Sequence, residues 1–503
     1  MFFIKIKVMI LKKLNLHFIK PNNLMNIQNY EQQLDNWIIK EKTAVSLSNV
    51  IGNLLLEFST ELVLFRNKLV DQSNTEILKL HEYSQIPNGK TISVQDTYAI
   101  ANAILGLKIK YGKIDIGKLA VQWNDEKTNF KSTDDFVKSK LVDFLDNKAL
   151  EPKDVVLYGF GRIGRLVARE LLSQAGSGGQ LRLRAIVTRS NSAEDITKRA
   201  SLLKTDSVHG KFSAEIIEDP ENNSLIINGR TIHFITAKNP SEINYNDYNI
   251  NNALVIDNTG AFRDKEALNL HLQSKGVSKV LLTAPGKGIP NIVFGVNHNV
   301  DIENEHIFSA ASCTTNAITP ILEVVEKELE IEKGHIETIH AYTNDQNLVD
   351  NMHSKYRRGR AAALNMVITE TGAGKAVTKA IPSLNNKLTS SAIRVPTPNG
   401  SLVILNLNVK NKTSLEGINN IIRKAAHSSE LIEQIRYSVS NELVSSDIVG
   451  DSCASIYDSP ATQVSNDGHS IVLYVWYDNE YGYTRQVVRL AKYIAKVRRK
   501  CYY

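Results

Sequence analysis

Three short segments of this 503-residue chain combine residue types that can perform chemistry. The first is a run of spaced glycines, Gly159-Phe160-Gly161-Arg162-Ile163-Gly164. The second places Cys313 among small polar residues, and the third contains His340. Spaced glycines before a helix can hold phosphate groups, and a cysteine thiol with a nearby base can act as a nucleophile. What these segments can do depends on the helices and strands that position them.

The glycine run lies between a short apolar strand predicted at 155–158 and a helical pattern over 166–172. In this context Gly159 permits a tight turn, Gly161 lets a pyrophosphate approach the backbone, and Gly164 lets helix and strand pack closely. The unpaired N–H groups of the helix N-terminus attract phosphate. The pattern predicts dinucleotide binding, and the alternative is a purely structural turn.

The next predicted strand, Arg184–Val187, indicates which dinucleotide fits. An NAD site usually has an acidic residue at the end of this strand, where it binds the ribose 2′-OH. Here Thr188 and Arg189 follow the strand, and a hydroxyl beside a guanidinium suits a 2′-phosphate. This favours NADP, with use of both NADP and NAD possible. The alternative is a plain surface loop.

Cys313 lies in Ser312-Cys313-Thr314-Thr315-Asn316, at the start of a helix predicted at 317–329. The positive end of a helix lowers the pKa of a thiol, so we expect a lowered pKa for Cys313. Polar neighbours argue against an inert core cysteine. His340, at the end of a predicted strand, has the best context of the 12 histidines for a catalytic base. Spacing alone leaves this pairing open.

From residue 154 onward, strands and helices alternate, which predicts a parallel α/β sheet. Strands are expected at 155–158, 184–188, 254–257 and 280–283, and longer ones at 401–410 and 471–477, with a terminal helix at 484–499. The predicted fold class is α/β, with a Rossmann-type dinucleotide-binding domain and an α+β catalytic domain. We expect the first at 151–312, completed by the C-terminal helix within 478–503, and the second at 313–477.

Residues 1–150 form a predicted helical N-terminal extension. Apolar residues at steps of three and four predict helices over 47–69, 94–105 and 136–145. No catalytic constellation is found there, so packing or oligomerisation is the favoured role, with regulation or partner binding as the alternative. Lysines interrupt the apolar start of the chain, and residues 1–24 are interpreted as a disordered tail or as an over-extended start before Met25.

Composition excludes few functions. Lys and Arg number 60 and Asp and Glu 53, and a net charge of +7 on so long a chain predicts neither nucleic-acid nor membrane binding. Three cysteines cannot form a disulfide framework and fit a reducing compartment, so we expect a cytoplasmic protein. No run of 18 apolar residues predicts a transmembrane helix, and no metal site is predicted.

Residues 153 to about 500 resemble phosphorylating glyceraldehyde-3-phosphate dehydrogenases. The resemblance lies in a series of motifs in family order: GFGRIGRLV, DSVHGKF, DNTGAF, GVNH, SCTTNAITP, TIHAYT, TGAGKAV, RVPTP and WYDNEYGY. Residues 1–150 are outside it, and such an addition resembles a longer bacterial branch of the family. The resemblance implies a homotetramer, and glyceraldehyde 3-phosphate and inorganic phosphate as substrates.

The resemblance also implies roles for individual residues. Cys313 matches the nucleophile that forms a hemithioacetal and then a thioester, and His340 matches the base. Arg394 and Thr343 match the site for the substrate's phosphate. The residues that match the site of the attacking phosphate are Ser312, Thr314, Thr371 and Gly372. Cofactor contacts are implied for Gly159, Gly161, Arg162, Ile163, Gly164, Thr188, Arg189, Thr259, Thr283 and Asn479, the last holding the nicotinamide carboxamide.

Three departures from the family pattern concern cofactor choice. Thr188 stands where NAD-using members have aspartate, and Asn351 and Met352 replace an apolar residue and a proline that help exclude a 2′-phosphate. All three favour NADP. Two alternatives stay open for the function: an erythrose-4-phosphate dehydrogenase, in which water cleaves the thioester, and a non-catalytic binding protein on the same fold. Retention of Cys313, His340 and Arg394 argues against the second.

Overall fold

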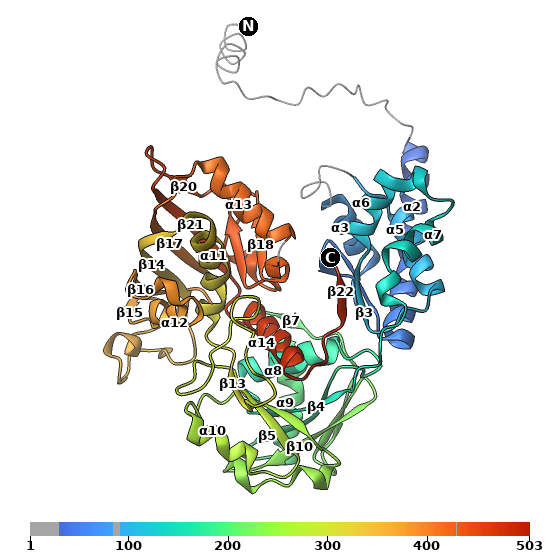
Figure 1. The fold of residues 1–503 in the computed structure, drawn as a ribbon. Coiled ribbons are helices and arrows are strands. Elements are labelled where there is room, and N and C mark those ends of the chain that lie inside the picture. Colours follow the sequence, from blue (N-terminus) through green and yellow to red (C-terminus); the bar gives the residue numbers. More distant parts are fainter. Residues whose placement is uncertain (1–29, 84–90, 429) are drawn as a thin grey trace. The chain divides into compact units, whose positions relative to one another are not determined.

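The computed structural model describes residues 30–83, 91–428 and 430–503 (Figure 1). The predictions for residues 1–24 lie outside this range. The chain forms two compact units. The smaller contains the described part of residues 1–52, together with 63–106 and 115–140, and the larger contains 53–62, 107–114 and 141–503. Residues 53–62, 107–114 and 141–150 of the predicted extension therefore belong to the same unit as everything that follows residue 150.

The smaller unit is mainly helical. Its helices are α2 (Tyr30–Phe58, whose last turns belong to the larger unit), α3 (Asn74–Tyr83), α5 (Val94–Gly106), α6 (Ile116–Glu126) and α7 (Thr133–Lys140). The helix predicted at 94–105 is confirmed. The one predicted at 136–145 is shorter, because α7 ends at Lys140 and a 3-10 turn, Val142–Phe144, follows it.

The helix predicted over 47–69 is wrong beyond residue 58. Ser59 adopts a left-handed φ of 54°, which ends α2. The next residues form strand β1 (Glu61–Leu64), which is buried throughout and pairs with β2 (Asn67–Lys68) in a hairpin. Leu62, Phe65 and Leu69 thus continue the helical spacing by coincidence, because a buried strand also presents a run of apolar residues.

The larger unit contains an eight-stranded sheet in the order β13-β12-β11-β4-β5-β10-β9-β8. Its strands are β13 (Ile307–Ser309), β12 (Val277–Leu282), β11 (Ala253–Asp257), β4 (Lys153–Tyr158), β5 (Leu181–Thr188), β10 (Arg230–Thr236), β9 (Ser224–Ile227) and β8 (Ile216–Asp219). The first six are parallel, as in a Rossmann-type domain, and the last two antiparallel pairings close one edge. The predicted strands are confirmed, with shifted ends.

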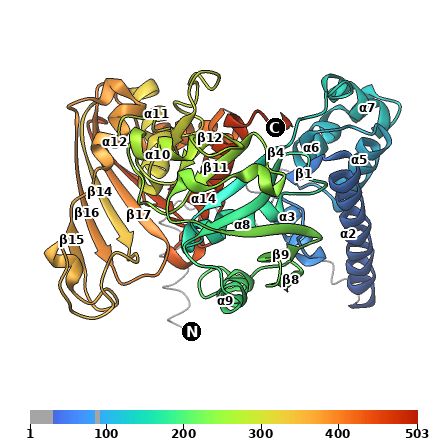
Figure 2. The same ribbon diagram turned by 90° about the horizontal axis from the view of Figure 1, so that it is seen from below.

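Helices α8 (Arg162–Ser173), α9 (Ala193–Lys204), α10 (Lys265–Leu272) and α14 (Tyr481–Ile494) accompany this sheet. A short hairpin, β6 (Thr205–Asp206) and β7 (Gly210–Lys211), follows α9. Both views place α14 beside α8 (Figures 1 and 2), and apolar residues of α14 share the core under β4 and β5. The C-terminal helix therefore completes the nucleotide-binding domain.

The terminal helix ends earlier than the predicted residue 499. It stops at Ile494, and Lys496 has a left-handed φ of 57°. Residues 500–502 then form strand β22 (Lys500–Tyr502), which pairs in parallel with β3 (Gly112–Asp115). This tail joins the segment 107–114 to the larger unit.

A second sheet has the order β15-β16-β14-β17-β21-β19-β18, with β20 (Gln463–Val464) beside β21. Its strands are β15 (Val367–Thr369), β16 (Leu388–Val395), β14 (Ile331–Ala341), β17 (Ser401–Val409), β21 (Ser470–Tyr477), β19 (Ser455–Asp458) and β18 (Ile435–Ser438). Helices α11 (Cys313–Leu329), α12 (Ala373–Ala380) and α13 (Leu415–Ser428) pack on it around a shared apolar core.

Together the two sheets confirm the predicted fold class, a parallel dinucleotide-binding domain followed by a mixed α+β domain. Within the described ranges, no helix is both long and apolar enough to cross a membrane.

Candidate active site

The glycine turn has the geometry that its spacing predicts. Gly159 has a φ of 95°, which favours glycine. A Cβ on Gly164 would lie 2.4 Å from the carbonyl oxygen of Gly159, so only glycine lets α8 pack so closely on β4. Gly161 is different: it caps α8, and a Cβ there would meet nothing within 4 Å. The backbone at Gly161 is therefore open to a pyrophosphate, and the turn fits a dinucleotide.

A pocket of about 420 Å³ adjoins this turn. Gly159, Thr188 and Thr259 line it, as does Arg189. Two further cations that the sequence analysis did not single out, Arg199 from α9 and Lys238 after β10, also line it. The Thr188 hydroxyl donates to Asn191 Oδ1 at 2.5 Å, so it holds the local turn. The pocket therefore carries three cations around the end of β5.

Asn351 and Met352 lie elsewhere. Neither lines the pocket beside Thr188, and Met352 is 90% exposed in a loop. The Arg162 side chain is engaged in ion pairs with Asp206 and Glu480. Its backbone, in the first turn of α8, is the part that fits the implied cofactor contact. Ile163 follows it in the first turn of α8 and packs against the domain core.

Cys313 is the first residue of α11, and Ser312 caps that helix by accepting a hydrogen bond from Thr315 N at 3.0 Å. Ser312 therefore has a structural role besides any contact with an anion. The next residue, Thr314, is buried, and its hydroxyl lies 2.9 Å from the hydroxyl of Tyr477 at the end of β21. This contact ties the cysteine loop to the second sheet.

The pairing of β14 with β16 brings the base and the anion-binding arginine together. Their parallel register places His340 opposite Arg394. His340 Nε2 lies 3.5 Å from Cys313 Sγ, and Arg394 Nη1 lies 3.1 Å from His340 Nδ1. The predicted Cys313–His340 pair is therefore present in the geometry. A proton on Nδ1, donated to the Ala341 carbonyl at 2.7 Å, leaves the Nε2 lone pair facing the thiol.

Burial dominates the titration of both groups. Desolvation raises the pKa of the Cys313 thiol, against the opposing effects of the Thr314 hydroxyl and the Arg394 charge. The expectation of a lowered pKa from the helix N-terminus was therefore wrong, because the thiol is buried. Burial, and then the charge of Arg394, lower the pKa of His340 to about 3. The imidazole is therefore neutral at pH 7, with its Nε2 unprotonated.

Arg394 and Thr343 form a second cluster next to this pair. Arg394 Nη1 donates to Thr343 Oγ1 at 3.0 Å, and Thr343 donates to Asp345, which also pairs with Arg358. Among the described residues, the buried Nε of Arg394 has no hydrogen-bond partner. A guanidinium edge thus remains available for an anion.

Asn479 is held by a residue that the sequence analysis did not identify. Ser401 Oγ donates to Asn479 Oδ1 at 2.7 Å and accepts from Ala341 N at 3.1 Å. Ser401 therefore links the implied nicotinamide contact to the residue after His340. Asp478 fixes the same turn, because its Oδ1 accepts from the backbone N–H groups of Glu480 and Tyr481 at 2.8 Å each. No local sequence signal distinguishes Ser401 from any strand serine.

Thr259 and Thr283 surround the end of β11. The Thr259 hydroxyl donates to Asp257 Oδ1 at 2.7 Å, and the Thr283 hydroxyl donates to the Asp257 carbonyl at 3.0 Å. Thr371 and Gly372 stand at the N-terminus of α12, where Thr371 Oγ1 accepts from Ala373 N at 3.2 Å. No hydrogen bond links this pair to Cys313, although α12 packs against α11.

Two family profiles match the larger unit. That of "Glyceraldehyde 3-phosphate dehydrogenase, NAD binding domain" matches residues 153–265, and that of the C-terminal domain of the same enzyme matches 312–479. The first covers the glycine turn, and the second covers Cys313, His340 and Arg394.

Curated relatives cover different shares of the chain. A "glyceraldehyde-3-phosphate dehydrogenase-like protein" of Pseudomonas aeruginosa (strain UCBPP-PA14) is 48% identical over 454 residues, or 89% of this chain and 98% of the relative. This is more than residues 153–503 can provide, so the match includes part of the N-terminal extension. Glyceraldehyde-3-phosphate dehydrogenase 2 of Synechocystis is 42% identical over 346 residues (68% of this chain, 98% of the relative).

The enzyme of the same name from Bacillus subtilis (strain 168) is 38% identical over 343 residues, which are 68% of this chain and 96% of the relative. These matches agree with the parallel domain, the open glycine turn and the cysteine–histidine pair. The chain therefore belongs to the glyceraldehyde-3-phosphate dehydrogenase family, as a nicotinamide-dinucleotide-dependent oxidoreductase that carries an N-terminal extension.

Proposed function

We propose that this protein oxidises glyceraldehyde 3-phosphate with inorganic phosphate to 1,3-bisphosphoglycerate, reversibly, and that it uses NADP or NAD. The observation that carries the proposal is the 3.5 Å contact of Cys313 Sγ with His340 Nε2, next to the anion-binding pair of Arg394 and Thr343. A nucleophile, a neutral base and a guanidinium clamp thus come together at one helix N-terminus.

In the first step, His340 accepts the thiol proton and the Cys313 thiolate adds to the aldehyde carbon. The N-terminus of α11 stabilises the oxygen anion of the hemithioacetal. Bound nicotinamide supplies the hydride acceptor for the oxidation. His340 then returns its proton to the hemithioacetal oxygen, which becomes a hydroxyl. During the oxidation the neutral His340 takes the hydroxyl proton back, and the carbon becomes a thioester on Cys313. Inorganic phosphate then attacks the thioester, which forms the acyl phosphate and restores the thiolate.

Two groups of residues would bind the anions of this reaction. The free edge of Arg394, with Thr343, suits the phosphate that the substrate carries. Thr314, Thr371 and Gly372 supply hydroxyl and backbone donors for the attacking phosphate. Retention of this second group favours phosphate over water as the nucleophile, and so argues against an erythrose-4-phosphate dehydrogenase.

The test is steady-state kinetics of the full chain with glyceraldehyde 3-phosphate, with and without inorganic phosphate. We expect phosphate-dependent turnover that Cys313→Ser abolishes, while Cys453→Ser, at a cysteine outside the site, leaves it intact. Erythrose 4-phosphate serves as the competing substrate. Turnover that is independent of phosphate and faster with erythrose 4-phosphate would overturn the proposal.

The preference for NADP is a separate proposal. Arg189, Arg199 and Lys238 line the pocket beside Thr188, and among the described residues that line it there is no carboxylate to repel a 2′-phosphate. We expect Thr188→Asp to lower the ratio of kcat/KM for NADP to that for NAD by about tenfold or more, which corresponds to about 1.4 kcal/mol. Thr188→Val removes the hydroxyl without adding charge and is the matched control. An unchanged ratio in Thr188→Asp would exclude this role.

We also propose that the protein is a homotetramer. The segment from the end of β14 through β15 exposes seven large apolar side chains that are 59–90% accessible: Leu348, Val349, Met352, Tyr356, Leu364, Met366 and Ile368. Such a patch is typical of an interface between chains. Light scattering should give four times the chain mass, and Met352→Asp with Tyr356→Asp should reduce it. A monomeric wild type would refute the proposal.

A further inference from the structure

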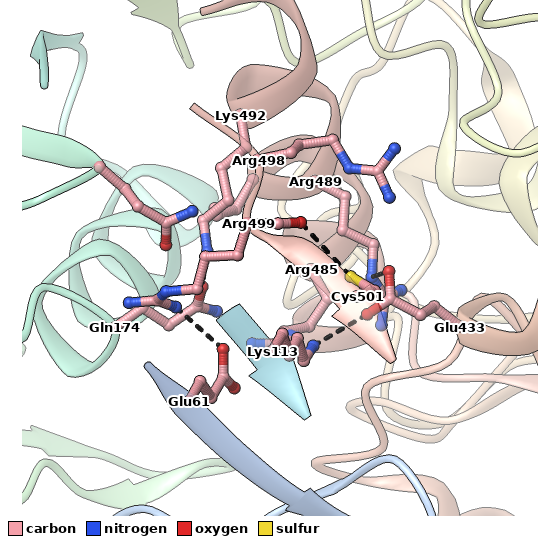
Figure 3. A pocket seen from close by; sticks show the side chains of 12 residues that line it. Glu61, Lys113, Gln174, Glu433, Arg485, Arg489, Lys492, Arg498, Arg499 and Cys501 are labelled. Atoms are coloured by element: carbon pink, nitrogen blue, oxygen red, sulfur yellow. Dashed lines mark hydrogen bonds and ion pairs between the residues drawn. The ribbon is translucent and has the colours of Figure 1, made fainter. Parts of the chain in front are cut away.

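A cavity of about 50 Å³ lies beside α14, within the larger unit, and Figure 3 shows the side chains that line it. Arg485, Arg489 and Lys492 project into it from one face of α14, because they are spaced by four and three residues. Arg498 and Arg499 follow from the C-terminal tail. The remaining charged residues that line it are Glu61, Lys113 and Glu433, of which the first two precede the dehydrogenase domains.

Cations outnumber anions in this cavity. Its lining holds six basic side chains and two carboxylates, and a third carboxylate, Glu170, pairs with Arg485 from outside the lining. Arg499 pairs with Glu61 at 3.0 Å, and Lys113 pairs with Glu433 at 2.9 Å. Even with Glu170 included, three positive charges are left over, one of which corresponds to the exposed Arg498. An uncompensated buried charge is unfavourable unless a counter-charge is present.

Part of this excess positive charge is carried by Lys492. Lys492 contacts the amide oxygen of Gln174, and within the described part of the chain no carboxylate lies within ion-pair distance of it. Burial, together with Arg499, Lys113 and Arg485, lowers the pKa of Lys492 to about 7, although Glu61 opposes this. The cavity therefore destabilises its own lysine charge. An anion bound in the cavity would stabilise the positive charge of Lys492.

Arg485 and Arg489 also have unused donors. Their Nε atoms are buried and have no hydrogen-bond partner among the described residues, and the side chains are 11% and 12% exposed. Arg489 Nε lies 3.6 Å from Glu433 Oε2, which is within ion-pair distance but beyond a hydrogen bond. Buried guanidinium donors are normally satisfied, so these two point to an absent acceptor.

We propose that this cavity is a binding site for a small tetrahedral oxyanion of the phosphate class. Its volume of about 50 Å³ is several times the roughly 10–15 Å³ that a single water needs, so the cavity has room for a small ion. Lys492 and the two guanidinium groups would supply charge-assisted hydrogen bonds. None of these residues belongs to the catalytic anion sites around Cys313 and Arg394, so the proposal does not depend on the proposed reaction.

The position of the cavity gives such a site a structural consequence. Its walls come from α14, from the tail before β22, and from the segments of β1 and β3 that carry Glu61 and Lys113. One anion would therefore cross-link three stretches of chain that are far apart in sequence. Because it would bind only the folded unit, it would stabilise that unit in proportion to its concentration.

The test compares Lys492→Met with Lys496→Met in the full-length protein. Lys496 is exposed two residues after α14 ends and is the matched control. Equilibrium dialysis with labelled inorganic phosphate counts the ions bound per chain. We expect Lys496→Met to bind as many phosphate ions as wild type and Lys492→Met to bind one fewer, or to bind it about tenfold more weakly.

Stability without phosphate gives a second readout. Lys492→Met should melt at the same or a higher temperature than wild type, since it removes like-charge repulsion, and should lose part of the stabilisation that added phosphate provides. Arg498→Met, on the exposed rim, should change phosphate binding in the same direction. A parallel dialysis with glycerol 3-phosphate shows whether the site also accepts a phosphate ester. Equal phosphate counts in wild type, Lys492→Met and Arg498→Met would overturn the proposal.

Discussion

Replacing Glu61 by glutamine should destabilise the larger unit strongly, although Glu61 precedes the dehydrogenase domains by almost a hundred residues. Glu61 Oε2 lies 3.0 Å from Arg499 Nη1, and the two side chains are 9% and 4% exposed. Arg499 also donates from Nε to the carbonyl of Ser59 at 2.7 Å. The variant would keep the shape of the side chain and leave the buried Arg499 charge without its closest carboxylate.

The size of the effect follows from the titration of Glu61. Burial favours the protonated acid, but the charges of Lys113 and Arg499 outweigh it and lower the pKa of Glu61 from 4.5 to about 2. At about 1.4 kcal/mol per pKa unit, this shift corresponds to about 3 kcal/mol of stability at pH 7. Removing one partner of a buried ion pair typically costs about the same.

The sign of the pH dependence is also determined. Because the pKa of Glu61 is lower in the folded protein, its contribution is complete above pH 4.5 and disappears as the pH falls towards 2. Urea unfolding at several pH values measures it. The free-energy difference between wild type and Glu61→Gln should be about 3 kcal/mol at pH 7 and should shrink steadily below pH 4.5.

Glu57→Gln, an exposed change in the last turn of α2, is the control and should cost less than about 0.5 kcal/mol. A second readout is amide hydrogen exchange in β22, which should accelerate in Glu61→Gln alone. Two results would refute the reasoning: a difference below about 1 kcal/mol at pH 7, or one that persists unchanged to pH 3.

Three further predictions concern the active site. His340→Gln should lower kcat about 100- to 10,000-fold, with cofactor affinity measured by fluorescence unchanged, and a loss below tenfold would argue against its role as base. Ser401→Ala should lower kcat about tenfold in steady-state assays, because it frees Asn479 and leaves the Ala341 N–H unpaired. If KM and the melting temperature are impaired as much as kcat is, the role of Ser401 is purely structural. Gly164→Ala should lower Tm, since its Cβ would meet the Gly159 carbonyl at 2.4 Å, whereas Gly161→Ala should fold normally and weaken only cofactor binding; equal melting temperatures would contradict this.

The elements that depend on local sequence could be predicted. The glycine turn was recognisable because the three glycines, the preceding strand and the following helix are contiguous in the chain. Cys313 at the start of α11 was recognisable for the same reason. The error at 59–69 shows the limit of this approach. There the apolar spacing suited a helix and a buried strand alike, and the left-handed turn at Ser59 decided between them.

Contacts between distant segments were decided only by the tertiary structure. His340 and Arg394 lie 54 residues apart, and the register of β14 on β16 places them side by side. Arg199 and Lys238 reach the pocket of Thr188 from different elements, and Ser401 reaches Asn479 across a sheet. Likewise, the raised pKa of Cys313 reflects burial by residues far along the chain. Local sequence determines which chemical groups are present and how each turn forms, whereas their distances and solvent exposure depend on strand pairing and packing, which no local pattern records.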